Sequence, residues 1–240
     1  MAFQGALTPE QIAENPHRQI QNWNREHDYA ICIDTDGCVL DNMWAKQLLV
    51  FHPLFMDIFG LRESEMHFRI HAEHHNLWGK TRGCDRYLAV QATLQSMLEC
   101  DQARKTLDVE YTEGLLESIN GYVHFVDSSD GARAFGMPSI IEYHKANGRN
   151  FDITRLLAWS ESVNRSFQYF TLSMPAFDGV RETLEYLSQK ADLMVVSSTP
   201  YCDLIEWWGN QNLTQYLQAI SGKEMGKKKD HIRLLMEAGG

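Results

Sequence analysis

The residues best placed to do chemistry in this sequence are two aspartates one residue apart, Asp34 and Asp36, followed directly by Gly37. They come after a short apolar run, Tyr29–Ile33, which predicts a strand buried on both faces. A carboxylate at the end of such a strand lies where open α/β sheets bind ligands, and a glycine in the turn lets the backbone approach a bound group. Because two carboxylates this close repel each other without a cation between them, Asp34 and Asp36 predict a Mg²⁺ site.

The stretch around these aspartates resembles the signature of the haloacid dehalogenase (HAD) superfamily, in which an apolar strand runs into Asp-x-Asp-Gly-x-x-x-Asp. Asp34, Asp36, Gly37 and Asp41 all fall on that pattern. The resemblance implies that Asp34 attacks phosphorus to form a phosphoaspartate. It also implies that Asp36 protonates the leaving oxygen and later activates water, with Gly37 close to the substrate.

Two later stretches are similar to the second and third motifs of the same family. A buried strand is predicted within Leu193–Pro200 and ends in hydroxyl side chains. The resemblance implies that Ser197 binds a phosphoryl oxygen, with Ser198 close by. The third motif is a lysine shortly before a helix, and its spacing favours Lys228, with Lys227 as the second choice. Such a lysine stabilises negative charge near the aspartates.

The elements that must position these residues follow from hydrophobic periodicity. Helices are expected over 9–14, 44–59, 86–99, 139–145, 153–163, 180–190, 201–208 and 232–238, and further strands over 217–220 and at Tyr122–Val126. Thr8 and Gln11 predict a capping box for the first helix. Trp207 and Trp208 are expected to pack in the core.

The long stretch between the first two strands is mostly helical in its pattern and has the length of a domain. The predicted fold class is therefore α/β, with a Rossmann-like core of parallel strands formed by residues 1–41 and 173–240. Residues 42–172 would form a large helical cap inserted after the first strand, as in the phosphatases of the resembling family.

Two groups of residues in the predicted cap leave alternatives open. The loop before residue 86 is rich in cations and glycine, so Arg82 or Arg86 would bind the polar part of a substrate. The same loop is also typical of an exposed connection. Four histidines, at positions 67, 71, 74 and 75, would share one helix face with a spacing suited to a metal. Exposed or packing histidines are the favoured explanation, because no cysteine and no pattern of supporting acids accompanies them.

The family's fourth motif, a strand followed by further acids of the Mg²⁺ site, is expected after the last predicted helix, and the sequence ends at Gly240. We therefore expect this chain to be the front part of a longer protein and, by itself, a poor enzyme, because losing those acids would weaken Mg²⁺ binding. The stretch Tyr122–Asp130 has a similar local pattern, and Asp127 and Asp130 are the first places to look for substitute acids.

The composition narrows the class of protein. The chain of 240 residues is long enough for one large or two modest domains, and its net charge of −10 argues against nucleic-acid and anionic-membrane partners. It has no apolar run near the roughly 20 residues that span a bilayer, and no signal peptide is expected. Five cysteines without a CxxC pair predict reduced thiols in a cytoplasmic protein.

The resulting hypothesis is a Mg²⁺-dependent phosphatase that hydrolyses a small phosphomonoester, a phosphorylated metabolite, through a phosphoaspartate. An acid at position 36 argues against a dehalogenase, which needs none there. A phosphomutase shares every motif and stays open as an alternative. A catalytically inactive binding module is the other alternative, because the fourth motif is missing.

Overall fold

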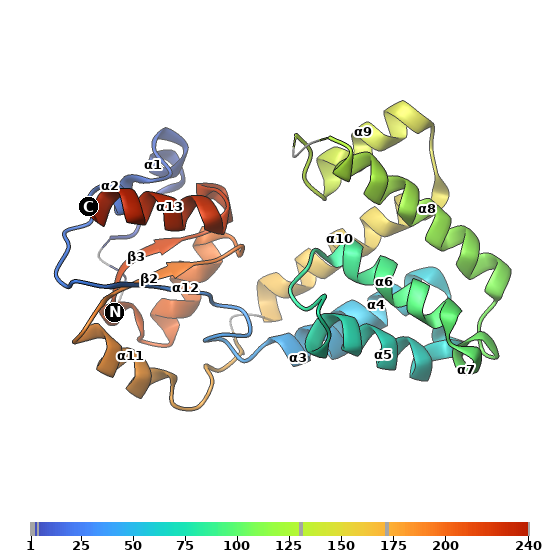
Figure 1. Cartoon of the computed structure of the whole chain (residues 1–240), viewed down its shortest axis with the longest axis horizontal. Coiled ribbons are helices and arrows are strands. Elements are labelled where there is room, and N and C mark those ends of the chain that lie inside the picture. The colour runs from blue at the N-terminus through green and yellow to red at the C-terminus, as the bar shows by residue number, and fades with distance from the viewer. Residues whose placement is uncertain (1–2, 4, 130–131, 171–172, 240) are drawn as a thin grey trace. The chain divides into compact units, whose positions relative to one another are not determined.

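The computed structural model describes residue 3 and residues 5–129, 132–170 and 173–239 (Figure 1). The chain divides into two compact units: residues 1–43 with 168–240, here called the sheet unit, and residues 44–167, here called the helical unit. Each unit has a hydrophobic core of its own. The predicted end of the cap at Leu172 lies outside the described residues.

The sheet unit contains three parallel strands in the order β1-β2-β3, and these are Ala30–Ile33, Asp192–Val196 and Leu217–Ser221. The helical unit is inserted between β1 and β2, so the predicted α/β class is confirmed. Ile33 pairs with Val195, and Val196 pairs with Ser221. The three strands therefore end at the same edge of the sheet, where a site for a ligand is expected.

Helices cover both faces of this sheet. Alternate residues of β2 point to opposite faces, as the period of two requires. Met194 packs with residues of α2 (Arg18–Gln21) and α13 (Lys228–Gly239). Leu193 packs on the other face in a core that includes residues of α11 (Val180–Ser188) and α12 (Tyr201–Asn210). Short helical turns span Thr214–Tyr216 and Lys223–Met225.

Two local predictions for the sheet unit are confirmed. Helix α1 (Pro9–Glu14) begins with a capping box, in which the Thr8 side chain accepts from Gln11 N and the Gln11 side chain accepts from Thr8 N. Trp207 and Trp208 are 1% and 0% exposed and lie in the core.

The prediction that the first strand is buried on both faces is wrong. Ala30 and Cys32 are exposed, and Tyr29 before them is 74% exposed, whereas every residue of β2 is buried. The physical reason is the position of β1 at an edge of the sheet, where it pairs with β2 alone among the described strands. An apolar run predicts that a strand forms, but it does not predict how many other strands lie beside that strand.

The helical unit consists of helices joined by short turns. Its elements are α3 (Met43–Lys46), a π-helical turn at Gln47–Phe51, α4 (His52–Phe59), a turn at Arg62–Ser64, α5 (Glu65–Glu73), a second π-helical turn at His74–Trp78, α6 (Arg86–Glu99), α7 (Asp101–Arg104), α8 (Val109–Asp127), α9 (Met137–Asn147) and α10 (Phe151–Phe170). The helix predicted over 44–59 is thus interrupted by one π-helical turn, and it ends at Gly60, whose φ of 68° suits glycine.

Two other predicted elements need correction. Tyr122–Val126 is not a strand but part of α8, because Tyr122, Val123 and Val126 form a buried helical stripe with Leu115 and Ile119. Asp127 is therefore the last residue of a helix, and Asp130 lies outside the described residues. The final helix begins at Lys228, four residues before the predicted start at position 232.

Candidate active site

The two aspartates of the motif follow β1 directly, and the residue between them anchors the strand end. Thr35 is 1% exposed, and its Oγ1 accepts a hydrogen bond of 3.2 Å from Trp208 Nε1. Because successive side chains of an extended chain point to opposite sides, burying Thr35 directs Asp34 and Asp36 away from that core contact. Both aspartates are half-buried. Trp208 thus supports the site as well as the core.

A tight turn after Asp36 brings the chain back toward the strand end. The N–H groups of Cys38, Val39 and Leu40 all donate to Thr35 O, and Gly37 N donates to Leu40 O at 3.0 Å. Gly37 has a φ of 68°, a left-handed conformation that glycine adopts without strain. The conformation explains glycine at this position, while its predicted contact with substrate stays a prediction.

Both carboxylate oxygens of Asp36 accept hydrogen bonds from side chains. Asn42 Nδ2 donates to Oδ1 at 2.6 Å, and Thr199 Oγ1 donates to Oδ2 at 3.0 Å. Asn42 is fully buried, so its contact holds Asp36 in one orientation. Sequence reasoning missed both partners. Thr199 follows the two serines that were singled out, and Asn42 directly follows Asp41, so adjacency to a motif was the only available signal.

Lys228 meets Asp34 across the sheet edge. Its Nζ lies 2.5 Å from Asp34 Oδ2, and each side chain is 40% exposed. The second carboxylate oxygen, Oδ1, accepts from Thr35 N at 2.8 Å. Lys228 is the first residue of α13, so its position follows from where that helix begins. Lys227, the second choice, is exposed.

Ser197 and Ser198 follow the end of β2. Ser197 is 2% exposed, its N–H donates to Ser221 O at 3.0 Å, and its Oγ accepts from Thr199 N at 3.2 Å. Ser198 is exposed. The structure therefore gives Ser197 a part in shaping the loop that carries Thr199, and phosphoryl binding by either serine stays a prediction.

Arg86 is held inside the helical unit. Its Nη1 donates to Ser160 O and Ser160 Oγ at 3.1 and 3.2 Å, and its guanidinium lies 5.2 Å from the centroid of the Phe51 ring. Burial lowers the pKa of Arg86 below its ordinary value. Arg82, in contrast, is exposed. These contacts assign Arg86 a packing role, and substrate binding by either arginine stays a prediction.

We expect the two arginines to respond differently to substitution. Arg86→Met should lower the free energy of unfolding by about 2 kcal/mol, because the hydrogen bonds of a half-buried charged group are lost. Arg82→Met should change it by less than about 0.5 kcal/mol and should raise KM for the natural substrate more than for a small aryl phosphate. Urea denaturation and steady-state kinetics measure both effects. Equal KM changes for the two substrates would contradict substrate binding by Arg82.

The oxygen donors at the end of β1 fit Mg²⁺. Mg²⁺ binds through one or two carboxylates together with waters and substrate phosphate. The Asp34 carboxylate and the Asp36 backbone carbonyl would be its protein ligands. The oxygens of both carboxylates also accept hydrogen bonds, Asp34 from Lys228 and Thr35 N and Asp36 from Asn42 and Thr199.

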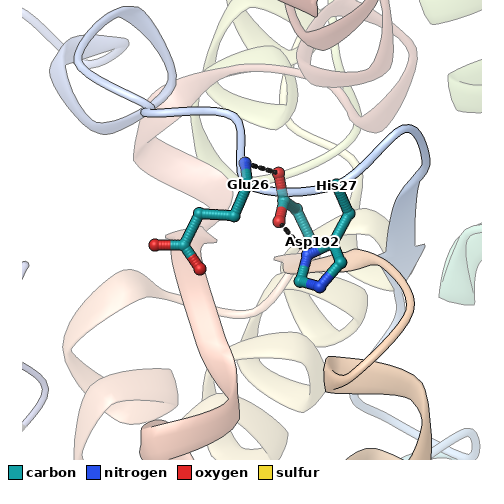
Figure 2. Close-up of side chains that lie close together, drawn as sticks. All are labelled: Glu26, His27 and Asp192. Atoms are coloured by element: carbon teal, nitrogen blue, oxygen red, sulfur yellow. Dashed lines mark hydrogen bonds and ion pairs between the residues drawn. The ribbon is translucent and has the colours of Figure 1, made fainter.

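A second place where side chains could hold a metal ion is separate from the aspartates of the motif. Within the described residues, it is formed by Glu26, His27 and Asp192, whose potential ligand atoms lie close together. Figure 2 shows these three residues. Asp192 begins β2, so the group lies at the opposite end of that strand from the site. The four histidines of the helical unit form no such group within the described chain; His71 and His75 instead share Ser96 Oγ as a hydrogen-bond partner.

Other expectations concern cysteines and membranes. All five cysteines are free, as reduced thiols require. Within the described ranges, no helix combines the length and the apolar character needed to cross a lipid bilayer.

Comparison with known proteins found similarity in solved structures alone, since no protein-family model and no curated protein matches the sequence. One similar chain is a candidate HAD-hydrolase, YfnB of Bacillus subtilis, bound to magnesium; it is 14% identical with a TM-score of 0.36, over 83% of this chain and 66% of that chain. Another is a candidate β-phosphoglucomutase of Thermotoga maritima, 13% identical with a TM-score of 0.35, over 88% of this chain and 71% of that chain.

Proposed function

We propose that the chain carries the active site of a HAD-like phosphatase that hydrolyses a small phosphomonoester through a phosphoaspartate on Asp34. One observation carries the proposal: residues far apart in the sequence meet at one sheet edge in the arrangement this chemistry needs. Lys228 contacts Asp34, and Thr199 contacts Asp36, with Asp34 at the end of a parallel strand. Open α/β sheets bind ligands at this edge.

The roles follow from the donors that each carboxylate meets. Lys228 and Thr35 N donate to the two oxygens of Asp34, the proposed nucleophile, and hold its carboxylate in one orientation. An Asp34 oxygen forms a bond to phosphorus while the ester oxygen leaves. Lys228 then also stabilises charge that develops on the phosphoryl oxygens. When bound, Mg²⁺ would neutralise charge on the Asp34 carboxylate and the phosphate.

We assign the proton transfers to Asp36. Its Oδ1 faces Asn42 Nδ2, which can only donate, whereas its Oδ2 faces the hydroxyl of Thr199, which can donate or accept. Rotation of the Thr199 hydroxyl therefore accommodates either protonation state at Oδ2. Protonated Asp36 would give its proton to the leaving oxygen, and the carboxylate would later take a proton from the water that attacks phosphorus.

The proposal predicts hydrolysis of an aryl phosphate such as p-nitrophenyl phosphate that needs Mg²⁺. Removing the metal with EDTA should lower turnover by about 10²-fold or more, and added Mg²⁺ should restore it, because the metal offsets repulsion between Asp34 and the phosphate. After acid quench during turnover, mass spectrometry should find one phosphoryl group on the peptide containing Asp34. A folded protein that shows neither turnover nor phosphorylation would favour the binding-module alternative.

A further inference from the structure

The segment before β1, residues 5–27, contacts the core of the sheet unit close to two loops, here called the site-bearing loops. One runs from β2 to α12 and carries Thr199, and the other runs from β3 to α13 and leads to Lys228. The segment includes α1 and α2, and α2 packs beside α13 (Figure 1). The polar contacts of this segment show how it is joined to the core.

One end of the segment is tied to the amino end of β2. Asp192 is fully buried, and its carboxylate accepts from Glu26 N at 3.0 Å and lies 2.8 Å from His27 Nδ1 (Figure 2). It also accepts from Trp23 Nε1 at 3.0 Å. Burial opposes ionisation, but these hydrogen bonds outweigh it and hold the pKa of Asp192 below its ordinary value. The carboxylate is thus satisfied by the segment itself, which explains this grouping without a metal.

Gln19 joins the segment to two elements of the core at once. Its Oε1 accepts from Ile220 N of β3 at 2.8 Å, and its Nε2 donates to Tyr201 Oη at 2.7 Å. Tyr201 Oη accepts a second bond from Leu7 N at 2.9 Å. Tyr201 is 4% exposed, so these bonds replace water for its hydroxyl. Gln19 therefore fixes the separation between β3 and the start of α12.

Tyr201 is also the residue at which the two site-bearing loops meet. Its N–H donates to Glu224 Oε2 at 2.8 Å, and a Cβ on Gly222 would lie only 2.7 Å from Tyr201 N. Lys223 N donates to Thr199 O at 2.9 Å. Thr199, the partner of Asp36, lies two residues before Tyr201 in the chain. A shift of Tyr201 would therefore also move Thr199.

A second contact of the segment reaches the helix that carries Lys228. The ring of His17, at the start of α2, lies 6.4 Å from that of His231, centroid to centroid. His231 is 0% exposed and lies three residues after Lys228, on the same face of α13. Ile20 of α2 packs with Leu235 one turn further along. Contacts of α2 thus set where α13 lies.

We propose that residues 5–27 are a positioning element of the active site and that Gln19, acting through Tyr201 and β3, holds Thr199 and Lys228 in place against the two aspartates. This inference rests on the proposed function and adds to it a segment that precedes every motif. Gln19 touches no reacting group, so it is a positioning residue.

The test is Gln19→Leu, which removes both hydrogen bonds at similar volume, compared with Gln215→Leu, an exposed glutamine of the same unit. We expect amide hydrogen exchange to become about tenfold faster in residues 199–203 and 220–228, with no change in α6 or α8. For an aryl phosphate, kcat should fall about tenfold while KM stays within twofold, because misplaced groups slow the chemical step. Gln19→Glu, which keeps an acceptor for Ile220 N and can accept from Tyr201 Oη, should restore both values.

If Gln19→Leu shows the same hydrogen exchange and the same kcat as Gln215→Leu, the inference is overturned. It is also overturned if exchange becomes faster throughout the chain and kcat and KM change by similar factors. If the parent chain has no turnover, the proposed function fails while the exchange measurement still decides whether Gln19 holds the two loops. Should Gln19→Leu not fold, Tyr201→Phe removes the shared hydroxyl with a smaller change. It is expected to give the same faster exchange and lower kcat, and unchanged values would again overturn the inference.

Discussion

Replacing Asp34 with asparagine is expected to lower turnover of an aryl phosphate by about 10³-fold or more. Asparagine has nearly the same shape, can still accept from Thr35 N, and cannot form the phosphoaspartate. The loss should therefore appear in kcat without unfolding, and the phosphoryl group trapped by acid quench should disappear. Steady-state kinetics, circular dichroism and mass spectrometry measure these three results.

The matched control is Asp178→Asn, which removes an exposed carboxylate from the same unit. It should keep activity within about twofold, since exposed substitutions away from a site have small effects. If Asp34→Asn retains a tenth or more of the parental rate, Asp34 is not the nucleophile. The carboxylate at the end of β1 would then have a binding or structural role.

Replacing Lys228 with methionine is expected to have the second largest effect, a fall in kcat of about 10²–10³-fold. Methionine keeps much of the aliphatic stem and removes the charge that lies 2.5 Å from Asp34 Oδ2. Stability should change by no more than about 1 kcal/mol, because a pair this exposed contributes little to folding. The combination of a large kinetic effect with a small change in urea denaturation distinguishes a role in chemistry from a role in folding.

Lys227→Met provides the control for the lysine assignment, because Lys227 is adjacent, exposed and of the same charge. It should lower kcat by less than about twofold. Similar losses in both variants would mean that the local positive charge matters and that no single lysine acts on the phosphoryl group. A larger loss in Lys227→Met would show that α13 begins differently in the active protein.

Much of the site could be predicted from the sequence because its chemical groups lie within short local patterns of residues. An apolar run that stops at two acids and a glycine places Asp34 and Asp36 at a strand end, whatever the rest of the chain does. The family resemblance implied Lys228, and this lysine contacts Asp34 in the structure, although α13 begins at Lys228 itself and not after it. The helices of the insertion followed from the period of their apolar residues, which depends on a single element.

Local patterns were misleading where a neighbour decides the outcome. Tyr122–Val126 has the composition of a strand, and burial against the helical core keeps it within α8. Ala30 and Cys32 belong to an apolar run, and the position of β1 at a sheet edge leaves them exposed. In the first case the strand preference of a short segment is weaker than the free energy of packing it against the rest of the fold. In the second case the strand forms as predicted, and its neighbours decide how much of it is buried.

The sequence by itself thus determined the chemical groups, the strand that presents them and the helical character of the insertion, since each is recorded within a few neighbouring residues. Only the tertiary structure decided which side chains hold those groups. Thr199 lies 163 residues from its partner Asp36, and Gln19 lies 201 residues from Ile220. Such contacts depend on strand order and register, which arise when the whole sheet forms and leave no periodic trace in the sequence around either partner.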